Sequence, residues 1–162
     1  MATIHASTVL VGGRAVLIRG PSGSGKSRLA LELIQAAQSG LIRFARFVGD
    51  DRVQLEAASG RLLARPAVAL AGLLEVRGVG ILKLDYEQAA VIGLVIDLAE
   101  AAAERLPAPD QRQVVIEGVR LPRLAVAPGD AALPALIAVI NSPARWLDEA
   151  LSPAHLVRAF QL

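Results

Sequence analysis

The sequence contains no cysteine, which excludes disulfide bonds, thiol catalysis and thiolate metal sites. Aromatic residues make up only 3% of the 162 residues, so the core must be built from Ala, Val, Leu and Ile. Such an aliphatic composition is typical of a largely buried sheet. Because 54% of the residues are hydrophobic, the chain has enough apolar material to fold. We therefore expect one compact domain over residues 1–162.

Strong charge and long apolar runs are also missing. The formal net charge is only +2, lysine occurs just twice, and no basic run or aromatic platform suggests a nucleic-acid partner. The longest apolar run, 89–98, is interrupted by Gly93 and Asp97 and falls short of the roughly 20 residues of a membrane helix. The first residues show no secretory signal pattern. These observations predict a cytoplasmic protein that binds neither nucleic acid nor membranes.

A glycine-rich motif near the N-terminus predicts a phosphate-binding loop. The pattern G-x-x-x-x-G-K-S/T is matched in full, with an apolar strand before it and an amphipathic helix after it. Its residues are Gly20, Pro21, Ser22, Gly23, Ser24, Gly25, Lys26 and Ser27. The glycines allow backbone N–H groups to approach phosphate oxygens closely, and the helix start favours an anion. Lys26 would contact the β- and γ-phosphates of ATP, and the Ser27 hydroxyl would bind Mg²⁺.

The hydrophobic patterns around this motif indicate an α/β domain. We expect strands over Thr3–Val11 and Ala15–Arg19 joined at Gly12 and Gly13, and a helix over Lys26–Gln38 that ends at Gly40. Further strands are expected over 44–48, 53–57, 61–64, 90–98 and 114–117, with an irregular strand or loop over 74–84. Helices should follow Pro134 and Pro153.

Two acidic segments are candidates for the remaining chemistry. Asp50 and Asp51 follow an apolar strand, where at most one of two adjacent carboxylates can face a bound phosphate. Gly-Asp-Asp is equally good turn chemistry, and the residues alone do not decide between the two interpretations. In the segment 74–81, Glu75 and Arg77 share one side of a short strand, and a surface ion pair is the simpler explanation for them.

Taken together, these segments resemble the catalytic domain of the HPr kinase/phosphorylase family. The resemblance rests on His5 before the loop, the loop itself, and the segments 49–53, 74–81, 104–106 and 126–129, so it covers nearly the whole chain. It implies a P-loop kinase core similar to the phosphoenolpyruvate carboxykinase-like fold, a mixed β-sheet with flanking helices. Family members with full-length chains carry an additional N-terminal domain, so the sequence is similar to the truncated single-domain form.

The resemblance also implies a role for each matching residue. Asp50 would accept the proton of a substrate serine, Lys26 would stabilise the transferring phosphoryl group, and Ser27 with Glu75 would hold Mg²⁺. His5 and Arg105 would join the active site, while Asp51 and Arg77 would orient the others. The implied substrate is HPr or a related phosphocarrier protein of the phosphotransferase system, and the implied assembly is a hexamer.

One departure from the family pattern concerns the reverse reaction. The family carries arginines around a late Pro-Gly pair in a loop tied to phosphorolysis, whereas Ala127 and Asp130 stand there in this chain. Fewer cations should weaken capture of free phosphate, so we expect little phosphorylase activity. Two other functions stay open on the sequence: a P-loop kinase for small molecules, and a non-catalytic nucleotide-binding regulator.

Overall fold

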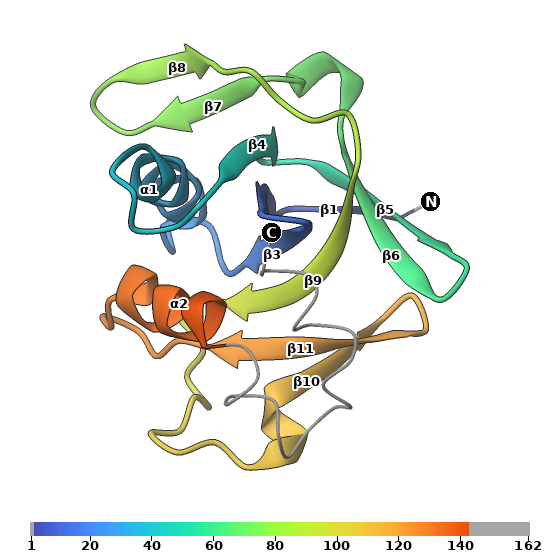
Figure 1. Ribbon diagram of the computed structural model, residues 1–162, viewed down its shortest axis with the longest axis vertical. Helices are drawn as coiled ribbons and strands as arrows, with labels where there is room; N and C mark the ends of the chain where they lie inside the picture. Colours follow the sequence, from blue (N-terminus) through green and yellow to red (C-terminus); the bar gives the residue numbers. More distant parts are fainter. Residues whose placement is uncertain (1, 143–162) are drawn as a thin grey trace.

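The computed structural model of the protein describes residues 2–142, in which two helices cover one face of a branched β-sheet (Figure 1). The strands of the main sheet are β1 (Ala2–Ile4), β2 (Ser7–Val11), β3 (Arg14–Arg19), β4 (Ala45–Gly49), β5 (Val53–Ala58), β6 (Arg61–Pro66), β9 (Ala90–Asp97), β10 (Gln113–Ile116) and β11 (Val119–Ala125). The hairpin β7 (Leu73–Val76) and β8 (Gly80–Lys83) forms a separate two-stranded sheet. The mixed α/β architecture confirms the expected fold class.

Strand β9 is the branch point of the sheet. Its start pairs antiparallel with β6, and its later residues lie between β3 and β11, both parallel to it. The order continues from β3 through β2 to β4, and from β6 through β5 to β1. The carboxyl ends of β3, β9 and β11 therefore lie at one edge, the edge where α/β proteins bind ligands.

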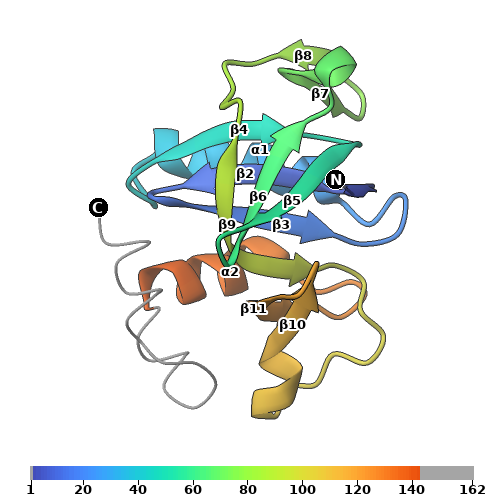
Figure 2. The same ribbon diagram turned by 90° about the vertical axis from the view of Figure 1, so that its right-hand side faces the viewer.

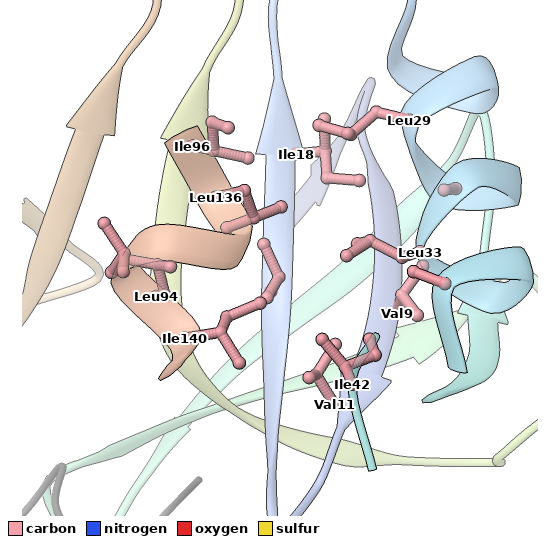
Figure 3. Close-up of a cluster of buried hydrophobic side chains, with 14 of the residues drawn as sticks. Val9, Val11, Ile18, Leu29, Leu33, Ile42, Leu94, Ile96, Leu136 and Ile140 are labelled. Carbon is pink, nitrogen blue, oxygen red and sulfur yellow. The ribbon is translucent and has the colours of Figure 1, made fainter. Parts of the chain in front are cut away.

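The helices α1 (Lys26–Gln38) and α2 (Ala132–Asn141) cover one face of this sheet, and an aliphatic core fills the space between them (Figure 3). Leu33 of α1 and Leu136 of α2 are both fully buried there. A second core on the opposite face is centred on Leu17, Leu55 and Val95. Two short 3₁₀ turns, η1 (Val68–Leu70) and η2 (Pro109–Arg112), lie in the connections.

Several expected elements have different limits in the structure. The single strand expected over Thr3–Val11 is divided at His5 and Ala6, because β1 pairs with β5 whereas β2 pairs with β3 and β4. The segment 74–84 forms a regular hairpin, and β11 was not expected at all. Helix α2 begins two residues before Pro134, which is tolerated in a first turn. The helix expected after Pro153 lies outside the described residues.

No helix within residues 2–142 is both long enough and apolar enough to span a membrane. Figure 2 shows the hairpin β7–β8 at the top of the view and the strands β10 and β11 of the main sheet near the bottom.

Candidate active site

The phosphate-binding loop joins β3 to α1, as the motif predicted. Gly20 has a φ of 155°, and a Cβ atom there would lie 2.5 Å from Ser24 Oγ and 3.0 Å from the Leu98 carbonyl oxygen. The tight approach explains why glycine stands at this position. Gly25, with φ 95°, precedes the first residue of α1, so the unpaired N–H groups at the helix start border the loop.

Lys26 lies with its side chain folded under this loop. The residue is only 7% exposed, and its ammonium group donates hydrogen bonds to the carbonyl oxygens of Gly20 and Pro21, at 3.0 and 3.1 Å. Burial lowers the pKa of Lys26 from its ordinary value, although the charges of Asp50 and Asp51 oppose the shift. Among residues 2–142 the ammonium group is held by carbonyl groups, without a direct carboxylate partner, at the place where an anion would bind.

Asp50 follows β4 and connects three elements through its carboxylate. The residue is only 5% exposed. The Ser27 hydroxyl donates to it, with Oγ 2.8 Å from Oδ2 and 3.0 Å from Oδ1. On the other side the hydroxyl of Ser7, from β2, donates to Oδ1. The structure therefore brings Asp50 against the last residue of the loop motif, whereas a plain Gly-Asp-Asp surface turn would leave this carboxylate in solvent.

Asp51 points elsewhere, which confirms that the two adjacent carboxylates diverge. Its backbone has a φ of 62°, and Oδ1 lies 2.9 Å from Nε2 of His5. Both side chains are more than half exposed. The strand pairs on both sides of this contact bring the two segments together, because Ile4 lies opposite Val53 and Thr8 lies opposite Gly49. The three residues between each pair, 5–7 and 50–52, must then face one another.

Glu75 and Arg77 lie on and just after β7 and are exposed, while Leu74 on the opposite side is fully buried. Leu74 packs into the core shared with α1, which fixes the hairpin above that helix (Figure 1). Within residues 2–142, neither Glu75 nor Arg77 forms an ion pair, so the surface ion pair considered for them is absent. Nor does the structure place Glu75 in contact with Ser27, and its role as a metal ligand stays a prediction.

Arg105 lies in the exposed connection between β9 and η2. Its neighbour Glu104 accepts a hydrogen bond from Gln111 at 3.0 Å. In the part of the chain that the structure describes, no hydrogen bond or ion pair links Arg105 to the phosphate-binding loop. Its place in the active site likewise stays a prediction.

An ion-pair cluster at the ends of the parallel strands was missed by the sequence analysis. Asp97, at the end of β9, accepts hydrogen bonds from Arg19 at 2.7 and 2.8 Å and from Arg123 at 2.5 Å. Arg123 also donates to Glu100 at 2.9 Å. Burial alone would raise the pKa of Asp97, but the two guanidinium groups outweigh it and hold this pKa below its ordinary value. An acidic residue that ends an apolar strand was the available signal.

An open pocket of about 460 Å³ borders the loop at Ser24 and Gly25, and Asp50 is not among its lining residues. Its walls come from the first turns of α1, the turn after β9 and the connection between β11 and α2. Leu29, Leu98, Val126 and Leu133 supply apolar surface, and Arg28 lies at the start of α1. The pocket thus adjoins the loop and offers an apolar wall large enough for a small organic group.

The oxygen atoms around the loop fit a magnesium ion. Mg²⁺ prefers oxygen ligands and is usually held by one or two carboxylates together with substrate phosphates. The Ser27 hydroxyl and the Asp50 carboxylate lie in direct contact beside the loop, and both are oxygen donors.

Comparison with protein-family models decides the family. Residues 1–143 match the model described as the HPr Serine kinase C-terminal domain. The chain belongs to this family. Among curated proteins, the HPr kinase/phosphorylase of Streptococcus thermophilus is 36% identical over 136 residues, which cover 76% of this chain and 41% of that protein. That of Clostridium beijerinckii is 43% identical over 79 residues, which cover 49% of this chain and 24% of its relative.

A solved structure supports the fold. The HPr(Ser) kinase/phosphatase structure from Coxiella burnetii matches with a TM-score of 0.72 and 24% identity, covering 93% of this chain and 100% of the other. In the sequence comparison above, this chain spans only about two fifths of the length of the Streptococcus thermophilus protein. The HPr kinase fold expected from the sequence is therefore confirmed.

Proposed function

We propose that this chain is the catalytic domain of an ATP- and Mg²⁺-dependent protein-serine kinase whose substrate is HPr or a related phosphocarrier protein. The observation that carries the proposal is the Asp50 carboxylate, buried against Ser27 of a phosphate-binding loop in a chain of the HPr kinase family. A loop alone indicates nucleotide binding, whereas a carboxylate beside its last residue adds a group able to accept a proton.

In this proposal each residue has one task. Lys26 binds the phosphoryl group that is transferred, and Asp50 accepts the proton of the attacking serine hydroxyl. Ser27 and Glu75 would hold Mg²⁺, which when bound supplies positive charge to the phosphates. Asp51 orients His5 beside the acceptor, as their 2.9 Å contact supports. Arg77 and Arg105 would assist from the hairpin and from the connection after β9.

The order of the strands in the main sheet supports one orientation for the bound ATP. Strand β3, which leads into the loop, has β2 and β4 with Asp50 on one side and β9 and β11 on the other. The open pocket follows β9 and β11. We therefore place the γ-phosphate of ATP toward Asp50 and its nucleoside in the pocket, against Leu98 and Val126.

A variant of the pocket tests this direction. Ala127 lines the pocket, so Ala127→Trp should fill it and weaken ATP binding while leaving the binding of inorganic tripolyphosphate unchanged. Ala138→Trp, at an exposed position of α2 outside the pocket, serves as the matched control. If the affinities for ATP and tripolyphosphate fall equally, or if neither falls, the nucleoside lies elsewhere.

A transfer assay tests the function itself. Purified protein is incubated with radiolabelled ATP, Mg²⁺ and either HPr or a panel of small acceptors, and the labelled product is identified. Label on a serine of HPr supports the proposal. Label only on a small molecule would identify a small-molecule kinase, and ATP binding without any transfer would identify a nucleotide-binding regulator.

We also propose that the protein assembles as a homo-oligomer, a hexamer by resemblance to its family. Light scattering of the purified protein across a concentration series measures the mass directly. A monomer at all concentrations would contradict this assembly without affecting the assignment of the site.

A further inference from the structure

Ser7 is a fully buried hydroxyl that the sequence analysis did not select. It lies on β2 opposite Ile18 of β3, at 0% exposure, on the same side of the strand as the core residues Val9 and Val11. A serine at a core position costs stability unless its hydroxyl forms a hydrogen bond. Here the bond goes to Oδ1 of Asp50, which is itself nearly buried.

The two hydroxyl groups on Asp50 are not equivalent. Ser27 reaches both carboxylate oxygens, yet a hydroxyl has one hydrogen and can satisfy only one of them at a time. Ser27 also belongs to the phosphate-binding loop, and its oxygen is the proposed metal ligand. Ser7, in contrast, lies outside the loop at the first residue of β2, where its backbone pairs with Ile18 of β3. It holds Oδ1 and leaves Oδ2 on the side of the loop.

We propose that Ser7 is a positioning residue that fixes the rotation of the Asp50 carboxylate and so presents Oδ2 to the acceptor hydroxyl. The inference rests on the proposed role of Asp50 as proton acceptor. A proton acceptor must lie within hydrogen-bond reach of its donor, and small errors in such geometry are costly, with about 1 Å of misplacement worth on the order of 100-fold in rate. A rigid donor below the carboxylate supplies the required orientation before substrate binds.

The next residue offers a matched control. Thr8 is also fully buried, but within the described residues its Oγ1 has no hydrogen-bond partner. As the following residue of β2, it points to the opposite face of the sheet. Thr8→Val removes a buried hydroxyl from the same strand without touching Asp50, so it reports the effect of such a change on folding alone.

The experiment compares kcat and KM for Ser7→Ala, Ser7→Cys and Thr8→Val with the unmodified protein, using HPr and radiolabelled ATP. We expect Ser7→Ala to lower kcat by about 10- to 100-fold and to leave KM for ATP within about twofold. Ser7→Cys keeps the shape of the side chain with a slightly larger sulfur atom that donates weakly, so it should resemble Ser7→Ala and not the unmodified protein. Thr8→Val should retain full kcat.

A double-mutant cycle separates positioning from general damage. With Asp50→Asn already present, Ser7→Ala should change kcat by less than about twofold, since the oriented carboxylate is gone. An equal loss in both backgrounds, or full activity of Ser7→Ala or Ser7→Cys, would overturn the role of Ser7. If the unmodified protein binds ATP but transfers no phosphate to HPr, the proposed function fails instead, and the two outcomes are thus distinct.

Discussion

Replacing Asp97 by alanine would remove the carboxylate that joins the ends of three parallel strands. Arg19 immediately precedes the phosphate-binding loop, and Arg123 lies three residues before the loop that borders the pocket. Both guanidinium groups share Asp97, whose side chain is 11% exposed, while those of Arg19 and Arg123 are 31% and 19% exposed. The substitution would leave two partly buried cations without their common partner.

The expected loss of stability follows from these exposures. Removing one partner of a fully buried ion pair costs about 3–5 kcal/mol, because the remaining charge is uncompensated. Here water reaches nearly a third of Arg19, and Arg123 keeps Glu100 at 2.9 Å, so part of that penalty is relieved. We therefore expect Asp97→Ala to lower the free energy of unfolding by roughly 2–3 kcal/mol.

Urea unfolding at neutral pH measures this free energy. If the slope of the unfolding free energy against urea concentration is unchanged, the substitution has not altered the compactness of the folded or unfolded state. Glu56→Ala is the matched control, because Glu56 pairs with Arg65 at 3.7 Å and both side chains are over 40% exposed. Such a surface pair contributes about 0–1 kcal/mol. If Asp97→Ala costs no more than Glu56→Ala, the cluster does not stabilise the strand ends.

The same cluster predicts a pH dependence with a definite sign. The pKa of Asp97 is lower in the folded protein than in the unfolded chain. The stability that Asp97 contributes is therefore complete above the pKa of the unfolded chain, about 3.9, and is lost as the pH falls through the lower pKa of the folded protein. Stability curves of the unmodified protein and Asp97→Ala should converge below about pH 4. A constant difference down to the lowest pH would contradict this assignment.

Three further predictions concern the phosphate site. Lys26→Ala should abolish transfer and weaken ATP binding, because the phosphates lose their buried cation; unchanged turnover would refute the loop assignment. Asp50→Asn should bind ATP yet phosphorylate HPr about 10²–10⁴-fold more slowly. If Asp51→Asn is instead the damaging change, the two aspartates have exchanged roles. By the family resemblance, the loop around Pro128 and Gly129 serves phosphorolysis, and the exposed Asp130 adds negative charge to it, so Asp130→Arg should accelerate phosphate-dependent dephosphorylation of phosphorylated HPr. Rapid phosphorolysis by the unmodified protein would contradict this explanation.

The local features of the site could be predicted from the sequence because each depends on neighbouring residues. The phosphate-binding loop is a continuous motif, and its strand and helix follow from apolar periodicity on either side. That Asp50 and Asp51 point apart was predicted, although the turn at Asp51, with a φ of 62°, produces the divergence, and not the alternation of a strand. The strands expected over 53–57 and 61–64 likewise form neighbouring strands, β5 and β6, with a tight turn at Ser59 and Gly60.

Features that depend on strand order could not be predicted in this way. Arg19, Asp97 and Arg123 meet only because β3, β9 and β11 are parallel neighbours, although Arg19 lies 78 residues before Asp97. Similarly, the partnership of Ser7 with Asp50 joins residues 43 positions apart. Periodicity places each residue on one face of its own strand but does not identify the strand beside it.

The division of the first strand at His5 and Ala6 links the fold to the site. Strand β2 pairs with β4, which ends just before the two aspartates, and β1 pairs with β5, which begins just after them. The backbone must turn at the aspartates to pass from β4 to β5. The segment that pairs with them, β1 and β2, must therefore be interrupted at the same level. The interruption frees His5 from the ladder and leaves it facing Asp51, while Ser7, the first residue of β2, faces Asp50. One break in strand pairing thereby orients both carboxylates, each by a different residue of the same short segment.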